Sequence, residues 1–194
     1  MIHESEIELY KRLLPELKVV FDVGCGDDNI FYELNPEIDV HLFDPEYREH
    51  LAVNKEIHYN DYALGNKKGF VDYYYSYGSI LLRDDEPKFD GQHQKREIKI
   101  DTLLNYCMAN KIKSIDLLKI DAEGYDIEVI KGCGKMLKRI KYIQFEVWDS
   151  TITELIELFT GYNIYQIGGK PLNLMATKEV LPLNLYYENS NMHT

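Results

Sequence analysis

The fold of this chain is decided by the stretch Val19-Val20-Phe21-Asp22-Val23-Gly24-Cys25-Gly26-Asp27-Asp28-Asn29. Its apolar part is typical of a strand buried on both faces, and the glycines that follow predict a turn at the carboxyl end of that strand. Glycine suits such a turn because the absence of a side chain lets the backbone approach a ligand. Open α/β sheets bind their ligands at this edge. The stretch therefore predicts an α/β sheet with a ligand site beside its first strand.

A second stretch, Val40-His41-Leu42-Phe43-Asp44-Pro45, is another short apolar strand that ends in a carboxylate. A carboxylate at the tip of the second strand is placed to accept hydrogen bonds from both hydroxyls of a ribose. The two stretches together predict a pocket for a cofactor that contains a nucleoside.

The residues of the glycine loop bear on which cofactor this is. The dinucleotide fingerprint G-x-G-x-x-G requires a third small residue beneath a pyrophosphate, and this chain has Asn29 there. Asp27 and Asp28 add two negative charges, whereas phosphate sites recruit backbone N–H groups and cations. S-adenosylmethionine has no phosphate, and its sulfonium and amino groups suit an acidic loop. The loop thus favours S-adenosylmethionine over NAD, while a strand–helix turn without a ligand stays open.

Length and composition limit the other properties of the chain. The 194 residues predict a single domain over 1–194, with a cofactor half at about 1–110 and an acceptor-side half at about 111–194. A net charge of −11 argues against bulk nucleic acid as a partner. Three cysteines without a C-x-x-C pair fit a reducing compartment. The acidic first residues are unlike a signal peptide, and no apolar run reaches the roughly 20 residues that cross a bilayer. We expect a cytoplasmic protein with no membrane partner.

Apolar strands alternate with amphipathic helices along the chain. The expected strands are 18–23, 39–43, 57–60, one that ends before Asp121, 140–147, 162–167 and 183–187. The expected helices are 4–14, 29–34, 46–51, 101–110, 125–131 with Gly132 as its C-terminal cap, and one that begins near Thr151. Residues 69–75 are expected to be extended, and 76–99 to form a flap over the ligand edge. This order predicts a mostly parallel sheet with helices on both faces.

Acidic residues end four of the expected strands. Asp22, Asp44, Asp121 and Glu146 occupy these positions. Because parallel strands end at the same edge of a sheet, the four carboxylates are expected to lie along one edge. This clustering is the strongest sign from the residues themselves that the edge is functional.

Several segments of the chain together resemble one known family. They are Phe21-Asp22-Val23-Gly24, Phe43-Asp44-Pro45, Ala63-Leu64-Gly65, Ile100-Asp101-Thr102-Leu103, Leu118-Lys119-Ile120-Asp121-Ala122-Glu123-Gly124 and Glu128-Val129-Ile130-Lys131-Gly132. In this order they resemble the FkbM family of S-adenosylmethionine-dependent methyltransferases, from about Val19 to Trp148. The resemblance implies a class I methyltransferase fold, which is Rossmann-like with a seven-stranded sheet. It also implies O-methylation of a sugar or another hydroxyl-bearing metabolite.

The resemblance also assigns roles by position. Asp22, Gly24 and Gly26 would line the methionine portion of the cofactor, Asp44 would hold the ribose, and 61–63 would border the adenine. The full expected cofactor-contacting set is Asp22, Gly24, Cys25, Gly26, Asn29, Asp44, Pro45, Asp61, Tyr62, Ala63 and Asp121. Family members usually carry Asn followed by Gly near the end of the first loop, where this chain has Gly26-Asp27-Asp28-Asn29. An inactive methyltransferase-like fold that serves as a cofactor-binding or interaction module therefore stays an alternative, with an NAD or nucleotide-sugar enzyme behind it.

Methylation of a hydroxyl needs a base within hydrogen-bond reach. The candidates for the catalytic machinery are Asp121, Glu123, Glu146, Lys119 and His93. Lys119 shares a strand face with Asp121, so the two are expected to pair. Each candidate also has a structural explanation: helix capping for Asp121 and Glu123, a hydrogen bond for Glu146, and simple solvation for His93.

Further groups of residues complete the expected site. The three acids are hard oxygen ligands that could hold Mg²⁺, whereas zinc is not expected there because no histidine lies at ligand spacing, and we assign no metal site. Flat walls for the acceptor could come from Tyr73, Tyr74, Tyr75, Tyr77 and Trp148. The expected partner is a small hydroxyl acceptor such as a sugar, bound by a monomer or homodimer.

Overall fold

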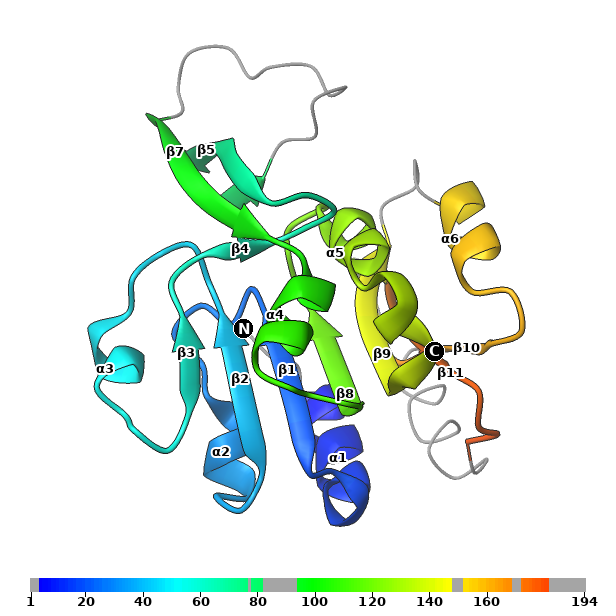
Figure 1. Cartoon of the computed structure of the whole chain (residues 1–194). Coiled ribbons are helices and arrows are strands. Elements are labelled where there is room, and N and C mark those ends of the chain that lie inside the picture. The colour runs from blue at the N-terminus through cyan, green and yellow to red at the C-terminus, as the bar shows by residue number, and fades with distance from the viewer. Residues whose placement is uncertain (1–3, 77, 82–93, 148–151, 169–171, 182–194) are drawn as a thin grey trace, which may run out of the picture.

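A seven-stranded sheet forms the centre of the computed structural model, which describes residues 4–76, 78–81, 94–147, 152–168 and 172–181 (Figure 1). The strand order is β10-β11-β9-β8-β1-β2-β3. The bounds are β1 Val19–Val23, β2 Asp39–Phe43, β3 His58–Asn60, β8 Ile115–Ile120, β9 Ile140–Val147, β10 Asn163–Gln166 and β11 Leu172–Thr177. Neighbouring strands pair in parallel along the series β3, β2, β1, β8 and β9, and β11 is antiparallel to both β9 and β10. The predicted, mostly parallel sheet is confirmed.

Helices cover both faces of this sheet, as predicted. Their bounds are α1 Glu4–Leu13, η1 Leu14–Glu16, α2 Ile30–Leu34, α3 Glu49–Ala52, α4 Leu103–Ala109, α5 Asp126–Gly132, η2 Gly134–Arg139 and α6 Ile152–Leu158. Alternate residues of β1 point to opposite faces, so Val20 packs in a core with α1 and α2 while Phe21 packs in a core with α4, α5 and α6. None of the helices in the described ranges is long and apolar enough to span a membrane.

A second sheet of four strands includes part of the expected flap. It contains β4 Ala63–Leu64, β5 Gly69–Ser76, β6 Gly78–Leu81 and β7 Gln94–Asp101, in the order β4-β7-β5-β6. The prediction of a flap over 76–99 was therefore wrong for 78–81 and 94–99, which form antiparallel ladders with β5. The reason is that Tyr73 and Ile98 are buried in the core and so hold β5 and β7 together. His93 lies outside the described residues.

One further prediction needs correction, and another is not tested. Among the described residues the last strand of the central sheet in chain order is Leu172–Thr177, whose Met175 and Ala176 are fully buried, and the strand expected at 183–187 lies outside the described residues. Gly132 is the last residue of α5 and does not act as a left-handed cap. It is needed for close packing, since a Cβ there would lie 2.0 Å from the carbonyl oxygen of Gly65.

A row of buried polar side chains crosses the three central strands on the face covered by α1. The register places Asp22 of β1 beside Lys119 of β8, and Lys119 beside Gln144 of β9. Lys119 Nζ lies 2.8 Å from Asp22 Oδ1, and Tyr10 of α1 donates a hydrogen bond of 2.8 Å to Gln144. Burial alone would lower the pKa of Lys119, but the adjacent carboxylates, Asp22 first, raise it above its usual value. Burial raises the pKa of Asp22, yet we take the pair as ionised because the ammonium lies in direct contact.

Replacing Lys119 by Met should destabilise the protein by about 3–5 kcal/mol, because the carboxylate of Asp22 would stay buried without a cation. The double variant Asp22→Asn/Lys119→Met removes both charges with little change of shape and should recover most of this loss. Urea unfolding followed by circular dichroism measures both variants. A single variant as stable as the double one would show that the ion pair is not coupled in this way.

Candidate active site

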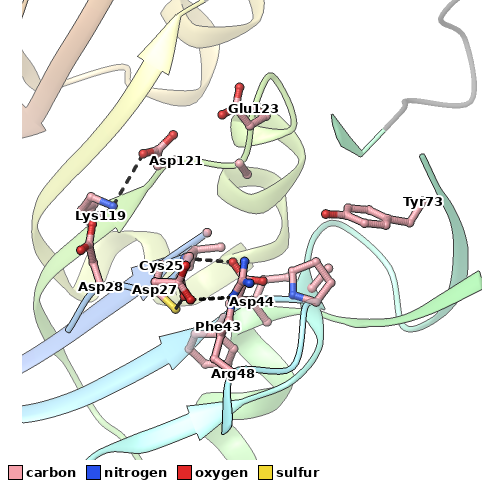
Figure 2. A pocket seen from close by; sticks show the side chains of 17 residues that line it. Cys25, Asp27, Asp28, Phe43, Asp44, Arg48, Tyr73, Lys119, Asp121 and Glu123 are labelled. Atoms are coloured by element: carbon pink, nitrogen blue, oxygen red, sulfur yellow. Dashed lines mark hydrogen bonds and ion pairs between the residues drawn. The ribbon is translucent and has the colours of Figure 1, made fainter. Parts of the chain in front are cut away.

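A cavity of about 350 Å³ opens at the carboxyl ends of β1, β2 and β8 (Figure 2). Its lining comes from four places: the loop after β1, the loop after β2, the end of β8 with the turn behind it, and the second sheet. The lining residues are Val23, Gly24, Cys25, Gly26, Asp27, Asp28, Phe43, Asp44, Pro45, Arg48, Ala63, Leu64, Tyr73, Lys119, Asp121, Ala122 and Glu123. The cavity therefore lies at the edge that the sequence predicts to be functional.

Both glycines of the first loop have left-handed backbones. Gly24 has φ of +77°, and a Cβ on it would lie 1.9 Å from the carbonyl oxygen of Asp121, so only glycine lets the ends of β1 and β8 meet. Gly26 has φ of +57°, and no atom lies within 4 Å of the place where its Cβ would be. The backbone of Gly26 is thus open on that side, and its N–H group points to Asp44.

Asp44 is the most firmly positioned carboxylate of the site. Its Oδ2 accepts a 2.9 Å hydrogen bond from the N–H of Gly26, and its Oδ1 accepts a 2.8 Å bond from the N–H of Glu46. Burial raises the pKa of Asp44, and these two N–H groups oppose that effect. A carboxylate has about four acceptor positions, so each oxygen still has one available for a ligand hydroxyl.

Arg48 and Tyr73 are among the lining residues that had no assigned cofactor role in the sequence analysis. Arg48 precedes α3, and its guanidinium lies 3.4 Å from Asp27 and 3.6 Å from Glu46. A basic residue four positions after the strand-end acid was the available signal for it. Tyr73 comes from β5 and was expected only as a wall for the acceptor. In Figure 2 its hydroxyl is directed into the pocket.

Arg96 of β7 connects the second sheet to the loop after β2, which lines the pocket. Its guanidinium lies 5.0 Å from the centre of the Tyr73 ring and donates hydrogen bonds to Pro45 O and Glu46 Oε1. The cation–π contact and the two bonds join β5 and β7 to the loop that follows β2. Arg96 therefore links the strand that carries Tyr73 to the loop that carries Asp44.

An acidic cluster of Asp121, Glu123, Asp126 and Glu146 lies at the ends of β8 and β9. Burial, together with the charges of Asp121 and Asp126, raises the pKa of Glu146 to about 7. Burial and Asp121 also raise the pKa of Glu123. Asn173 of β11 donates a 3.2 Å hydrogen bond to Glu146 and so orients it. A carboxyl group that titrates near neutrality is suited to proton transfer.

Asp126 is a buried member of this cluster that the sequence analysis missed. Its two oxygens accept hydrogen bonds from the backbone N–H groups of Ala122, at 3.3 Å, and Glu146, at 2.9 Å. Burial raises the pKa of Asp126 to about 6, although these bonds oppose the shift. Asp126 thereby joins the turn after β8 to the end of β9. The alternative explanation of Asp121 and Glu123 as helix caps has no support, because α5 has no side-chain cap.

The structure brings together only part of the predicted site. The expected cofactor residues in the lining are Gly24, Cys25, Gly26, Asp44, Pro45, Ala63 and Asp121. Those outside it are Asp22, Asn29, Asp61 and Tyr62. Asp22 is buried beneath the pocket against Lys119, Asn29 precedes α2, and Asp61 is exposed. Tyr62 packs edge-on against Phe43 and under Lys99.

Only some of the candidate catalytic residues line the cavity. Asp121, Glu123 and Lys119 line the cavity, Glu146 lies beyond it, and His93 is not described. Lys119 has the expected contact with Asp121, at 3.9 Å, but its nearer partner is Asp22. Since its pKa is raised, Lys119 stays protonated and cannot accept a proton. Within the part of the chain that the structure describes, the acids of this cluster do not converge as metal ligands do.

Comparisons with known proteins agree with this geometry. The family model described as "Methyltransferase FkbM domain" matches residues 17–164. The curated 2-O-methyltransferase NoeI of Sinorhizobium fredii (strain NBRC 101917 / NGR234) is 23% identical over 179 residues, which cover 79% of this chain and 71% of that protein. A crystal structure of a putative caffeoyl-CoA O-methyltransferase from Staphylococcus aureus has a similar fold, with a TM-score of 0.51 and 11% identity over 92% of this chain and 85% of that one. Because the family match spans well over half of its length, the chain belongs to the FkbM family of methyltransferases.

Proposed function

We propose that this protein transfers a methyl group from S-adenosylmethionine to a hydroxyl oxygen of a small, sugar-like acceptor. The observation that carries the proposal is the Asp44 carboxylate, fixed by two backbone N–H groups at the tip of β2 and facing a cavity of about 350 Å³. This volume falls at the lower end of the range for small-molecule sites. The O-methyltransferase name of the curated relative supports a hydroxyl acceptor.

The residues of the cavity fit S-adenosylmethionine by their chemistry. Asp44 would accept hydrogen bonds from the ribose hydroxyls, and the open backbone at Gly26 would lie against the ligand. The carboxylates of Asp28 and Asp121 would face its cationic groups. When bound, this cofactor supplies a methyl carbon activated by an adjacent sulfonium.

The alternatives are less well supported by the same contacts. An NAD-type ligand would bring a pyrophosphate into a cavity lined by Asp27, Asp28, Asp121 and Glu123, where its charges would be repelled. An inactive module would be expected if the altered loop blocked the pocket. The loop leaves the pocket open, since Asp27 is largely exposed and its carboxylate lies beside Arg48.

Glu146 is the best placed base in the described residues. In the transfer, the acceptor oxygen forms a bond to the methyl carbon as the carbon–sulfur bond breaks, and the hydroxyl proton goes to a carboxylate. With the cofactor in the lined cavity, the acceptor would approach past β8 and β9, where Glu146 lies beyond the lining. Asn173 donates a hydrogen bond to its carboxylate, and Asp126 accepts one from its backbone N–H group. Alignment of the reacting groups would supply much of the rate.

Replacing Asp44 by Ala should weaken the binding of S-adenosylhomocysteine by roughly ten- to a hundredfold, because a charge-assisted contact of about 1.5–3 kcal/mol is lost. Isothermal calorimetry on the purified protein measures this. Asp61→Ala is the matched control, since Asp61 is an exposed acid outside the lining. If the wild-type protein binds no S-adenosylhomocysteine, the proposed function is wrong.

Methylation should rise with pH through about 7 and level off above it, because a base with a raised pKa is active only after it loses its proton. Glu146→Gln should lower kcat by about 10²–10⁴-fold and remove this pH dependence, while the affinity for S-adenosylhomocysteine stays unchanged. Release of S-adenosylhomocysteine with a panel of hexoses and methyl glycosides measures the rate. An unchanged pH profile in Glu146→Gln would assign the base to another residue.

A further inference from the structure

Three metal-ligating side chains meet on β2 and β3, away from the pocket. Asp39 is the first residue of β2, His41 follows two positions later on the same face, and His58 of β3 is paired with His41 in the sheet register. Their ligand atoms all lie within 4.8 Å of one another. The nearest distances are 3.4 Å from His41 Nε2 to Asp39 Oδ1 and 3.1 Å from His58 Nε2 to the same oxygen.

His41 is the unusual member of this group. Its side chain is buried, with 3% of the residue exposed, and its Nε2 atom has no hydrogen-bond partner. A buried polar atom without a partner costs about 1–3 kcal/mol. Asp39 Oδ1, at 3.4 Å, is too distant for a good hydrogen bond. The unpartnered nitrogen is therefore directed toward Asp39 and His58, where a ligand could satisfy it.

The other nitrogen of His41 is held in a way that suits metal binding. His41 Nδ1 lies 2.8 Å from the hydroxyl of Tyr106, which is on α4. If Nδ1 carries the proton and donates it to this oxygen, the lone pair of Nε2 is free to bind a cation. Metal-binding histidines characteristically donate their second nitrogen to such a partner, which fixes the tautomer and the ring orientation.

We propose that Asp39, His41 and His58 bind one divalent transition-metal ion of the Zn²⁺ class. Two imidazole nitrogens and one carboxylate oxygen form a common zinc ligand set, with the fourth position left to water. Zinc–nitrogen bonds of about 2.0–2.1 Å in a tetrahedron place neighbouring ligand atoms roughly 3.3 Å apart. The distances of 3.1 and 3.4 Å are close to this separation.

The geometry also shows what must move when the ion binds. The rings of His41 and His58 are stacked, with centres 4.5 Å apart and planes at 13°. Because the lone pairs of parallel rings do not converge, both nitrogens reach one ion only after one ring rotates out of the stack. His58 and Asp39 can make this adjustment because their side chains are 59% and 50% exposed, whereas His41 is fixed in the core.

The site is separate from the pocket and does not depend on the proposed function. Asp39 begins β2, while Asp44 follows its other end. An ion held by residues of both strands would join the edge strand β3 to β2. An ion that binds the folded chain and not the unfolded one would also raise the unfolding temperature, by an amount that grows with the logarithm of its concentration.

The test is titration of the untagged, metal-free protein with ZnCl₂ in a calorimeter, and with CoCl₂ followed by visible absorption. Wild type should bind one equivalent, give the intense visible bands of four-coordinate cobalt, and unfold at a higher temperature with Zn²⁺. Asp39→Asn and His58→Gln should each weaken binding by at least about tenfold, as should Tyr106→Phe through the loss of the bond to Nδ1. Since Asp39 and His58 are exposed, their variants are expected to fold.

His50→Gln is the matched control, because His50 is exposed and lies outside the group. It should bind Zn²⁺ as wild type does. The proposal is overturned if wild type binds no Zn²⁺ at millimolar concentration, or if Asp39→Asn and His58→Gln bind as tightly as wild type. Loss of binding in His50→Gln alone would place the ion elsewhere and would overturn it as well.

Discussion

The buried ion pair between Asp22 and Lys119 is the contact on which the geometry of the site depends. It fixes β1 against β8 in a register that places Val23 beside Ile120, so that the loops after the two strands begin side by side. A slip of one residue would turn Lys119 toward the apolar core on the other face and leave its charge unpaired. Such a pair adds little stability over apolar residues, but breaking it costs several kcal/mol. The ion pair therefore makes other registers of β1 against β8 less stable than the observed one.

The loop after β1 depends on this register. The contact of Gly24 with the carbonyl of Asp121 exists only because both residues follow paired strand ends. Gly26 then turns its N–H group toward Asp44 on the next strand. Three neighbouring strands thus each contribute one group to a single pocket wall, and the side chains of Asp27 and Asp28 have no part in these backbone contacts. This arrangement explains why the loop can differ from the usual family pattern and still leave the pocket open.

The sequence predicts the parts whose signal is local. Strands β1, β2, β8 and β9 are mostly apolar because both faces of each are largely buried, and the acids at their ends mark the functional edge. The second sheet was missed because β5 and β7 pair with each other across residues 82–93, which no local pattern reveals. The roles of Asp126 and Arg48 depend on contacts between loops. The nearer partner of Lys119 was likewise not predictable from local sequence, because Asp22 lies on the neighbouring strand and is 97 positions away in the chain.

The acids at the edge act on one another, and this links the choice of cofactor to the choice of base. Burial is the first cause that raises the pKa of Glu146 to about 7, and the charges of Asp121 and Asp126 add to it. The same mutual repulsion makes the cavity unfavourable for a phosphate and favourable for a cation. The preference of this edge for a cation over a phosphate and the raised pKa of the neighbouring Glu146 thus share one contribution, the mutual repulsion of these carboxylates. This shared contribution supports assigning both the cofactor and the proton acceptor to this edge of the sheet.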